Sequence, residues 1–136
     1  MLDAIRDFGQ SGAILLLGLA VGAAWIAAIV APNTSYDHLK GDDAEEHVRE
    51  LLRSASDPIA VLLLVAAALA ILGGALVSGI TSLLAAFGFF TNRFTLPTGE
   101  SAKESGGKTQ RVLAVSMTLV FSVVAAAAAG MAVFGI

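Results

Sequence analysis

The chain has 136 residues, of which 57% are hydrophobic and 14% charged, and its mean hydropathy is +0.82. A soluble domain of this length needs less apolar material for its core, so the composition indicates a membrane protein. The net charge of −3, without any Lys/Arg cluster, excludes a nucleic-acid-binding surface, and the lack of cysteine excludes disulfides, thiolate metal sites and palmitoylation.

Three uncharged apolar blocks, residues 13–31, 59–90 and 112–136, carry the excess of hydrophobic residues. Each exceeds the length usually taken to mark a membrane-spanning helix. We therefore expect an all-α fold, a multi-pass integral membrane helical bundle that forms a single domain over residues 1–136. The expected spans lie at about 13–31, 59–72, 75–90 and 112–135, with polar loops at 33–57 and 91–111 and a short amphipathic surface helix.

The first block is predicted to be a retained anchor rather than a signal peptide. Two aspartates and one arginine precede it, and its apolar run is longer than an ordinary signal sequence has. Before it, Leu2, Ile5 and Phe8 recur at helical spacing and predict a short amphipathic turn at the membrane interface. Trp25 and Tyr36 are predicted interface anchors, an interpretation that we favour over ligand stacking.

The segment Ala31-Pro32-Asn33 is expected to end the first helix, because proline disfavours helical geometry in the residue before it. A polar helix is predicted to follow, with Asp42 as its N-cap and Glu45 completing a capping box. Its apolar residues form one stripe, so the helix should lie on the membrane surface or against the bundle. The stripe consists of Ala44, Val48, Leu51, Leu52 and Ala55.

The second block is expected to begin at Asp57-Pro58, with aspartate as N-cap and proline in the first turn. As one helix, residues 59–90 would extend about 48 Å, against a hydrocarbon layer of about 30 Å. Gly73-Gly74 near the middle, with Ser78-Gly79 shortly after, favour a hairpin instead. Its two halves, about 21 and 24 Å long, are short for membrane spans.

The basic residues offer an independent test of topology. Four spans place both charged loops on one side, so that seven of the eight Lys and Arg residues can be cytoplasmic. Three spans give only a five-to-three division. We therefore favour four spans over three and expect a bacterial inner (cytoplasmic) membrane protein with its N-terminus outside.

The apolar blocks contain no Asp, Glu, Lys, Arg or His, which argues against a pump or an ion-coupled carrier. Both histidines, His38 and His47, lie in the first loop, so a histidine-ligated haem or pigment within the membrane is not expected. Asp43, His47 and Glu50 share one helical face, and we favour a solvated acidic surface over a divalent-metal site there. The sequence predicts no catalytic, metal-binding or cofactor-binding residue and no cofactor.

Small residues at a spacing of four mark candidate helix-packing faces. The pairs are Gly18 with Gly22, Gly74 with Ser78, and Ala126 with Gly130. We expect packing within the chain, which is favoured over homo-oligomerisation. Hydroxyl side chains could bond between helices or to carbonyls of their own helix; they are Thr81, Ser82, Ser116, Thr118 and Ser122.

The stretches "GLAVGAAWIAAIVAP" and "FFTNRFTLP" resemble those of a bacterial four-span membrane domain of unknown function allied to eukaryotic transmembrane protein two-zero-five. The matching features are Ala31-Pro32, Leu39, and the segment from Asn92 to Pro97, and they cover about half of the chain. The segments "NTSYDHL" and "RSASDP" depart from the aromatic residues expected there. The resemblance implies four spans and no biochemical activity.

The favoured function is that of a non-catalytic accessory or structural subunit in a membrane protein complex, not an enzyme. The absence of ionisable groups from the spans and the small-residue faces support this interpretation. The alternative is a small oligomeric channel or carrier for neutral or lipid-like molecules, with Ser and Thr faces lining the path. A membrane enzyme using the acidic loop is the third hypothesis. The expected partners are the lipid bilayer and other membrane subunits, with homo-oligomerisation possible and nucleic acid excluded.

Overall fold

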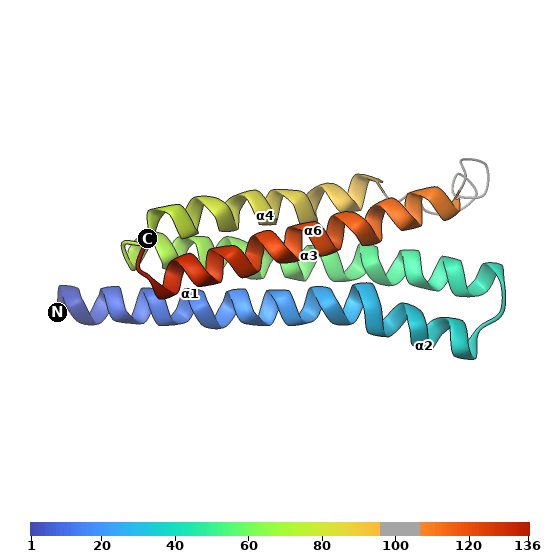
Figure 1. Ribbon diagram of the computed structural model, residues 1–136, viewed down its shortest axis with the longest axis horizontal. Coiled ribbons are helices and arrows are strands. Elements are labelled where there is room, and N and C mark those ends of the chain that lie inside the picture. Colours follow the sequence, from blue (N-terminus) through green and yellow to red (C-terminus); the bar gives the residue numbers. More distant parts are fainter. Residues whose placement is uncertain (96–106) are drawn as a thin grey trace.

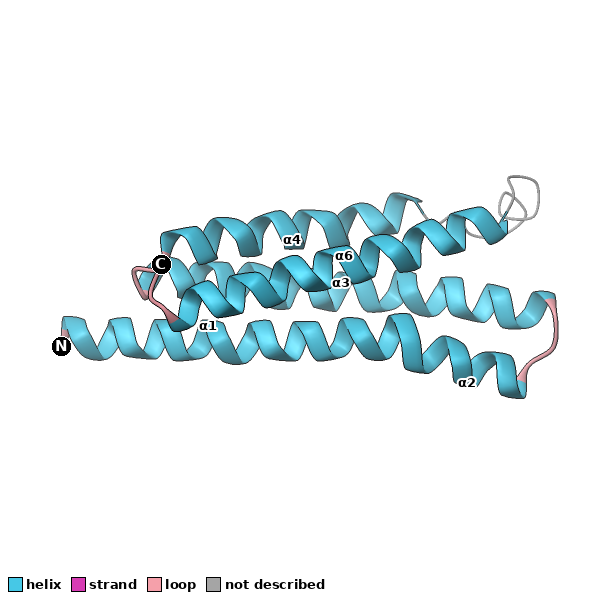
Figure 2. Cartoon of the chain, viewed as in Figure 1, coloured by secondary structure: helices cyan, strands magenta, loops and turns pink. Residues whose placement is uncertain are grey.

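A computed structural model describes residues 1–95 and 107–136, and helices account for nearly all of them (Figure 2). No strand occurs in these two ranges, so the all-α expectation is confirmed. The elements are α1 (Leu2–Trp25), a π-helical turn η1 (Ile26–Val30), α2 (Ala31–His38), α3 (Asp42–Leu72), α4 (Leu76–Thr95) and α6 (Gly107–Val133).

The helices form an elongated antiparallel bundle (Figure 1). Helix α1 continues through η1 into α2 as one bent rod, and α3 returns along it. Helix α4 packs against α3, and α6 fills the remaining side by packing against both α4 and α1. We call the end that holds both termini and the α3–α4 connection the turn end, and the end that holds the α2–α3 connection the polar end.

Among the described residues, three helical rods are long and apolar enough to cross a membrane: Leu2–His38, Asp42–Leu72 and Arg111–Val133. Their lengths are 37, 31 and 23 residues. This arrangement of helices is compatible with an integral membrane protein.

The apolar block from residue 59 to 90 reverses direction at Gly73 and Gly74, which confirms the predicted hairpin. The amide of Ala75 donates to the carbonyl of Ala70 and the amide of Gly74 to that of Ile71, the pattern of a Schellman motif. This motif needs a left-handed residue after the C-cap, and Gly74 supplies it with φ of +83°. A continuous helix over residues 59–90 is therefore excluded.

The expected end of the first helix at Ala31-Pro32-Asn33 is wrong. The amide of Ala31 donates to the carbonyl of Ile26, five residues back, so the helix passes through a π-turn and continues to His38. Pro32 falls in the first turn of α2, where the missing N–H is tolerated. The π-turn places the proline where its ring can be accommodated without ending the helix.

The separate surface helix is also wrong, because α3 runs from Asp42 to Leu72 without interruption and contains Pro58 in its interior. Asp57 is therefore not an N-cap. Gly41 occupies the N-cap position of α3, and no side chain caps it, so the predicted capping box of Asp42 and Glu45 does not form. The amphipathic stripe does pack against the bundle: Val48 and Leu52 join Ala27 and Ala114 in one buried cluster.

Small side chains fill the core and let the helices approach closely. A Cβ on Gly9 would lie 2.7 Å from the carbonyl oxygen of Leu69, and one on Gly73 would lie 2.7 Å from the amide nitrogen of Gln10. Gly88 makes room for the ring of Phe121 in the same way, with 2.3 Å left for a Cβ. Helices α1 and α3 are thus in backbone-level contact, whereas at Gly88 a side chain of α6 packs directly against the backbone of α4.

Hydrogen bonds between different helices close the turn end. The Gln10 side-chain amide on α1 donates to the carbonyl of Ala132 at the end of α6. The amide of Ser78, in the first turn of α4, donates to the carbonyl of Ile136. These bonds satisfy backbone groups that helix ends leave unpaired, which matters most where water is scarce.

Candidate helix-docking site

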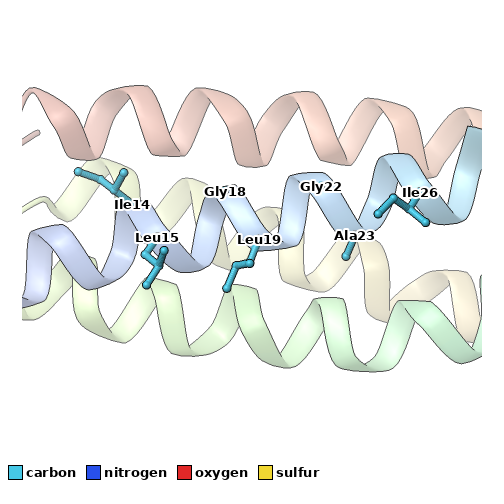
Figure 3. Close-up of a pocket in the computed structure, with 7 residues that line it drawn as sticks. All are labelled: Ile14, Leu15, Gly18, Leu19, Gly22, Ala23 and Ile26. Carbon is cyan, nitrogen blue, oxygen red and sulfur yellow. The ribbon is translucent and has the colours of Figure 1, made fainter.

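A shallow apolar groove runs along the outward side of α1 (Figure 3). Its volume is about 600 Å³, and its lining residues come from α1 and the first residue of η1. They are Ile14, Leu15, Gly18, Leu19, Gly22, Ala23 and Ile26.

The floor of the groove exists because Gly18 and Gly22 carry no side chain. A Cβ built on either residue would meet nothing within 4 Å. Gly9, on the same helix, lies instead against α3 with no room for a Cβ. Gly18 and Gly22 therefore have no role in packing this chain against itself, which contradicts the expectation of intramolecular packing for this pair.

Large apolar side chains form the rim of the groove. Leu15 is 65% exposed, Leu19 is 54% exposed and Ile26 is 60% exposed. Figure 3 shows Leu15 and Leu19 projecting on the same side of α1, one turn apart. A bare backbone floor beside such a ridge is the surface that a second helix packs against in a membrane, where van der Waals contact drives association.

The other two predicted packing pairs differ from the first. Ala126 and Gly130 are exposed on α6, and a Cβ on Gly130 would also meet nothing within 4 Å. Gly74 and Ser78 do not form a pair on one helix, because Gly74 lies in the turn before α4. Ser78 itself is fully buried and donates to the carbonyl of Ala128 at 2.8 Å, so it links α4 to α6.

The two predicted aromatic anchors lie toward the polar end and both make specific contacts. Trp25 is 51% exposed, and its Nε1 donates to Ser122 Oγ on α6 at 3.2 Å. Tyr36 is 42% exposed, and the Arg111 guanidinium lies 5.1 Å from the centre of its ring. Both side chains are thus about half exposed while they connect α1 or α2 to α6.

The hydroxyl groups of the apolar blocks mostly bond within their own helices. Ser82 donates to the carbonyl of Ser78, Thr118 to that of Ala114, and Thr81 to that of Val77. Ser122 also bonds to its own helix, at the carbonyl of Leu119. Ser116 is exposed on α6.

Asn92 is a buried polar residue that sequence reasoning did not single out as a packing residue. Its Nδ2 donates to Thr118 Oγ1 at 2.9 Å, across the α4–α6 interface, while its Oδ1 has no partner. The signal was available, since Asn92 is the first amide side chain after a long apolar run. What the sequence did not show is that α4 extends past this residue to Thr95 and turns it inward.

Ion pairs also join the helices. Arg93 on α4 lies 3.1 Å from Asp57 on α3, and both side chains are about half exposed. Arg111 on α6 lies 3.1 Å from Glu45 on α3 and is better shielded, with 18% of its side chain exposed. Arg111 thus connects α6 to both α3 and Tyr36 at the polar end.

The acidic face of α3 and the two histidines lie on the surface. Asp43, His47 and Glu50 are exposed, as is His38 on α2. Within residues 1–95 and 107–136, no three His, Asp or Glu side chains come together as a metal site would require. The groove on α1 carries no polar side chain, so its chemistry is that of apolar contact.

Comparison with known proteins gives no assignment: no family model, curated protein or solved structure matches the chain.

Proposed function

We propose that the chain is a four-span integral membrane protein of the bacterial inner membrane, and that it acts as a non-catalytic subunit which binds a transmembrane helix of another protein. The α1 groove is the proposed docking site. The observation that carries the proposal is the open space above Gly18 and Gly22. No contact within the described bundle requires a glycine at either position.

The proposed topology rests on the ends of the bundle. Four antiparallel helices that all cross would bring both termini and the α3–α4 turn to one side. Seven of the eight basic residues then belong to the other side, which the positive-inside rule assigns to the cytoplasm. The four-span domain that the sequence resembles has the same number of crossings.

Single-cysteine labelling tests this topology, and the chain offers a clean background because it has no native cysteine. In intact cells, Leu76→Cys at the start of α4 should react with a membrane-impermeant maleimide. Ser54→Cys, exposed on α3 toward the polar end, should react only after lysis. Labelling of both positions, or of neither, in intact cells would contradict four spans with an outside N-terminus.

A photo-crosslinker placed at Leu19 tests the docking site. We expect it to join the chain to a different membrane protein in native membranes. Gly22→Leu, which fills the groove, should abolish the crosslink, because a side chain there blocks close approach of a second helix. Ala68→Leu, at an exposed small residue of α3, is the matched control and should leave the crosslink intact.

A crosslink that joins two copies of this chain would replace the proposed heterologous partner with a homo-oligomer. A crosslink that survives Gly22→Leu would show that the groove is not the docking site.

The channel or carrier hypothesis receives less support. Four of the hydroxyl side chains are at most 2% exposed and lie within one bundle instead of lining a surface that an oligomer could share: Ser78, Ser82, Thr118 and Ser122.

A further inference from the structure

The apolar surface extends farther from the turn end along α1 and α6 than along α3 and α4. We infer that the α3–α4 face is built for a hydrocarbon layer about 24 Å thick, several Å thinner than the layer that suits α1 and α6, so that the protein thins the bilayer on that side. This inference rests on the proposed four-span topology.

The Asp57–Arg93 ion pair marks the edge of the apolar α3–α4 face that lies farthest from the turn end. The two side chains are 45% and 47% exposed, so the pair lies on the outer surface of the bundle. Asp57 lies 16 residues before Gly73 in the turn. Arg93 lies 17 residues after Leu76, the first residue of α4. At about 1.5 Å per residue both charges lie about 24 Å from the turn end.

Below that pair, the outward side chains of α3 and α4 are large and apolar. Val61 and Leu64 on α3, and Ile80, Leu84 and Phe87 on α4, are all at least half exposed. Among the described residues, the large exposed apolar side chains of this side thus end at the ion pair, apart from Phe94, which directly follows Arg93 and is 75% exposed. Charged groups are costly in hydrocarbon, so the layer should end at the level of the ion pair.

The apolar surface of α1 extends farther from the turn end than that of α3 and α4. Gln10 lies level with Gly73, because a Cβ on Gly73 would be 2.7 Å from the Gln10 amide nitrogen. From Gln10, outward apolar residues continue through η1, where Ile26 and Val30 are 60% and 55% exposed. Val30 lies about 30 Å from Gln10, which matches an ordinary hydrocarbon layer.

The α6 face is similar to α1. Val112 and Leu113 are 53% and 50% exposed, and they lie about 30 Å along α6 from Ala132, the residue that Gln10 contacts at the turn end. Two adjacent helices thus fit a layer of ordinary thickness, and the other two fit one that is about 6 Å thinner.

Two ways of avoiding the mismatch are closed by the geometry. Tilting a rigid bundle moves both edges of the α3–α4 face together and does not lengthen it. Arginine can extend its long side chain toward the headgroups, but Asp57 has a short side chain and is bound to Arg93 at 3.1 Å. The remaining adjustment is in the lipid, which can thin locally at modest cost.

Fluorescence quenching by brominated lipids tests the inference face by face. Trp25 is the chain's single tryptophan, so Trp25→Phe gives a silent background. Leu84→Trp then reports on lipid beside α4, and Val123→Trp on lipid beside α6; the native side chains are 58% and 63% exposed and lie at similar heights. The full-length protein is reconstituted in phosphatidylcholine vesicles in which a brominated eighteen-carbon lipid competes with chains of fourteen to twenty-two carbons.

We expect the Leu84→Trp probe to report a preference for the shortest over the longest chains that is at least about three-fold stronger than the Val123→Trp probe reports. Equal preferences at the two probes would overturn the inference and leave the membrane topology standing. If neither probe is quenched by any brominated lipid, the proposed membrane insertion itself fails.

A second pair of variants tests the cause. Asp57→Leu combined with Arg93→Leu removes the charges that end the α3–α4 face, and should move the preference of the Leu84→Trp probe toward longer chains. Lys40→Leu combined with Asp43→Leu, at exposed charges beyond the apolar surface, is the control and should leave the preference unchanged. An unchanged preference in the first double variant would overturn the inference; if that variant does not fold, the comparison of the two probes decides alone.

Discussion

Replacing Gly9 by alanine should destabilise the bundle far more than the same replacement at Gly18, although both glycines lie on α1. A Cβ on Gly9 would be 2.7 Å from the Leu69 carbonyl oxygen and 2.8 Å from the Gly73 amide nitrogen. Both neighbours are backbone atoms of α3 or its C-cap, and neither can rotate away. A Cβ on Gly18 meets nothing within 4 Å.

The magnitude follows from how far α1 must move. Ordinary contact between a Cβ and a backbone atom begins near 3.4 Å, so α1 and α3 must separate by about 0.7 Å at this crossing. Overpacking of this kind costs about 1–3 kcal/mol. The separation would also strain the Gln10 bond to Ala132, which lies one residue away.

Unfolding in mixed micelles with increasing SDS, followed by Trp25 fluorescence, measures the difference. The unfolded state keeps its helices in such micelles, so the higher helix propensity of alanine contributes little to either variant. We expect Gly9→Ala to lower the free energy of unfolding by about 1–3 kcal/mol and Gly18→Ala to change it by less than about 0.5 kcal/mol. Equal effects of the two variants would refute the close crossing of α1 and α3.

Three further predictions concern polar contacts and the proline in α3. A double-mutant cycle of Asn92→Leu and Thr118→Val should give a coupling free energy of about 0.6 kcal/mol, the usual size for a hydrogen bond between membrane helices. A coupling of zero would contradict a hydrogen bond between the two side chains. A cycle of Glu45→Gln and Arg111→Gln should give a coupling of about 0.5–1 kcal/mol that shrinks in high salt, whereas a salt-independent value would show that the pair is not ionic in origin. Pro58→Ala restores an N–H donor inside a continuous helix and should therefore slow hydrogen exchange in the preceding turn of α3; unchanged or faster exchange there would contradict that.

Local sequence chemistry was sufficient to predict the hairpin. Gly73-Gly74 in the middle of an overlong apolar run predicts a reversal, and the structure places a Schellman motif there. The apolar blocks likewise predicted the helical content and the long helices. In these places the determining signal lies within a few residues of the feature itself.

The helix boundaries failed where tertiary contacts override proline and capping preferences. Pro32 and Pro58 both lie inside helical rods, because each is close to a packed segment. Ala27 and Ala28 are buried just before Pro32, and Ser56 and Ile59 are buried on either side of Pro58. Asp42 is not the N-cap because Gly41 holds that position and Asp42 is the first helical residue, while Glu45 is paired with Arg111 from a distant part of the chain. A single sequence does not reveal such long-range competition.

The candidate docking site was only half visible in the sequence. The Gly18–Gly22 spacing identified the residues, but spacing does not tell which side of a helix faces the bundle. That is decided by where Gly9, Ala13, Leu17, Ala20 and Ala24 pack, since these buried residues set the rotation of α1 and leave the glycine pair outward.

The π-turn at Ile26–Val30 has a consequence for how the gene can vary. A turn that closes over five residues instead of four holds one amino acid more than an α-helix needs at that place. Deleting one residue within η1 could therefore restore regular α-helix while both flanking faces keep their alignment. The same deletion in the middle of α1 would turn everything beyond it by about 100° and expose its buried alanines. Natural relatives or selected variants that differ in length by one codon along this rod should carry the change at the π-turn.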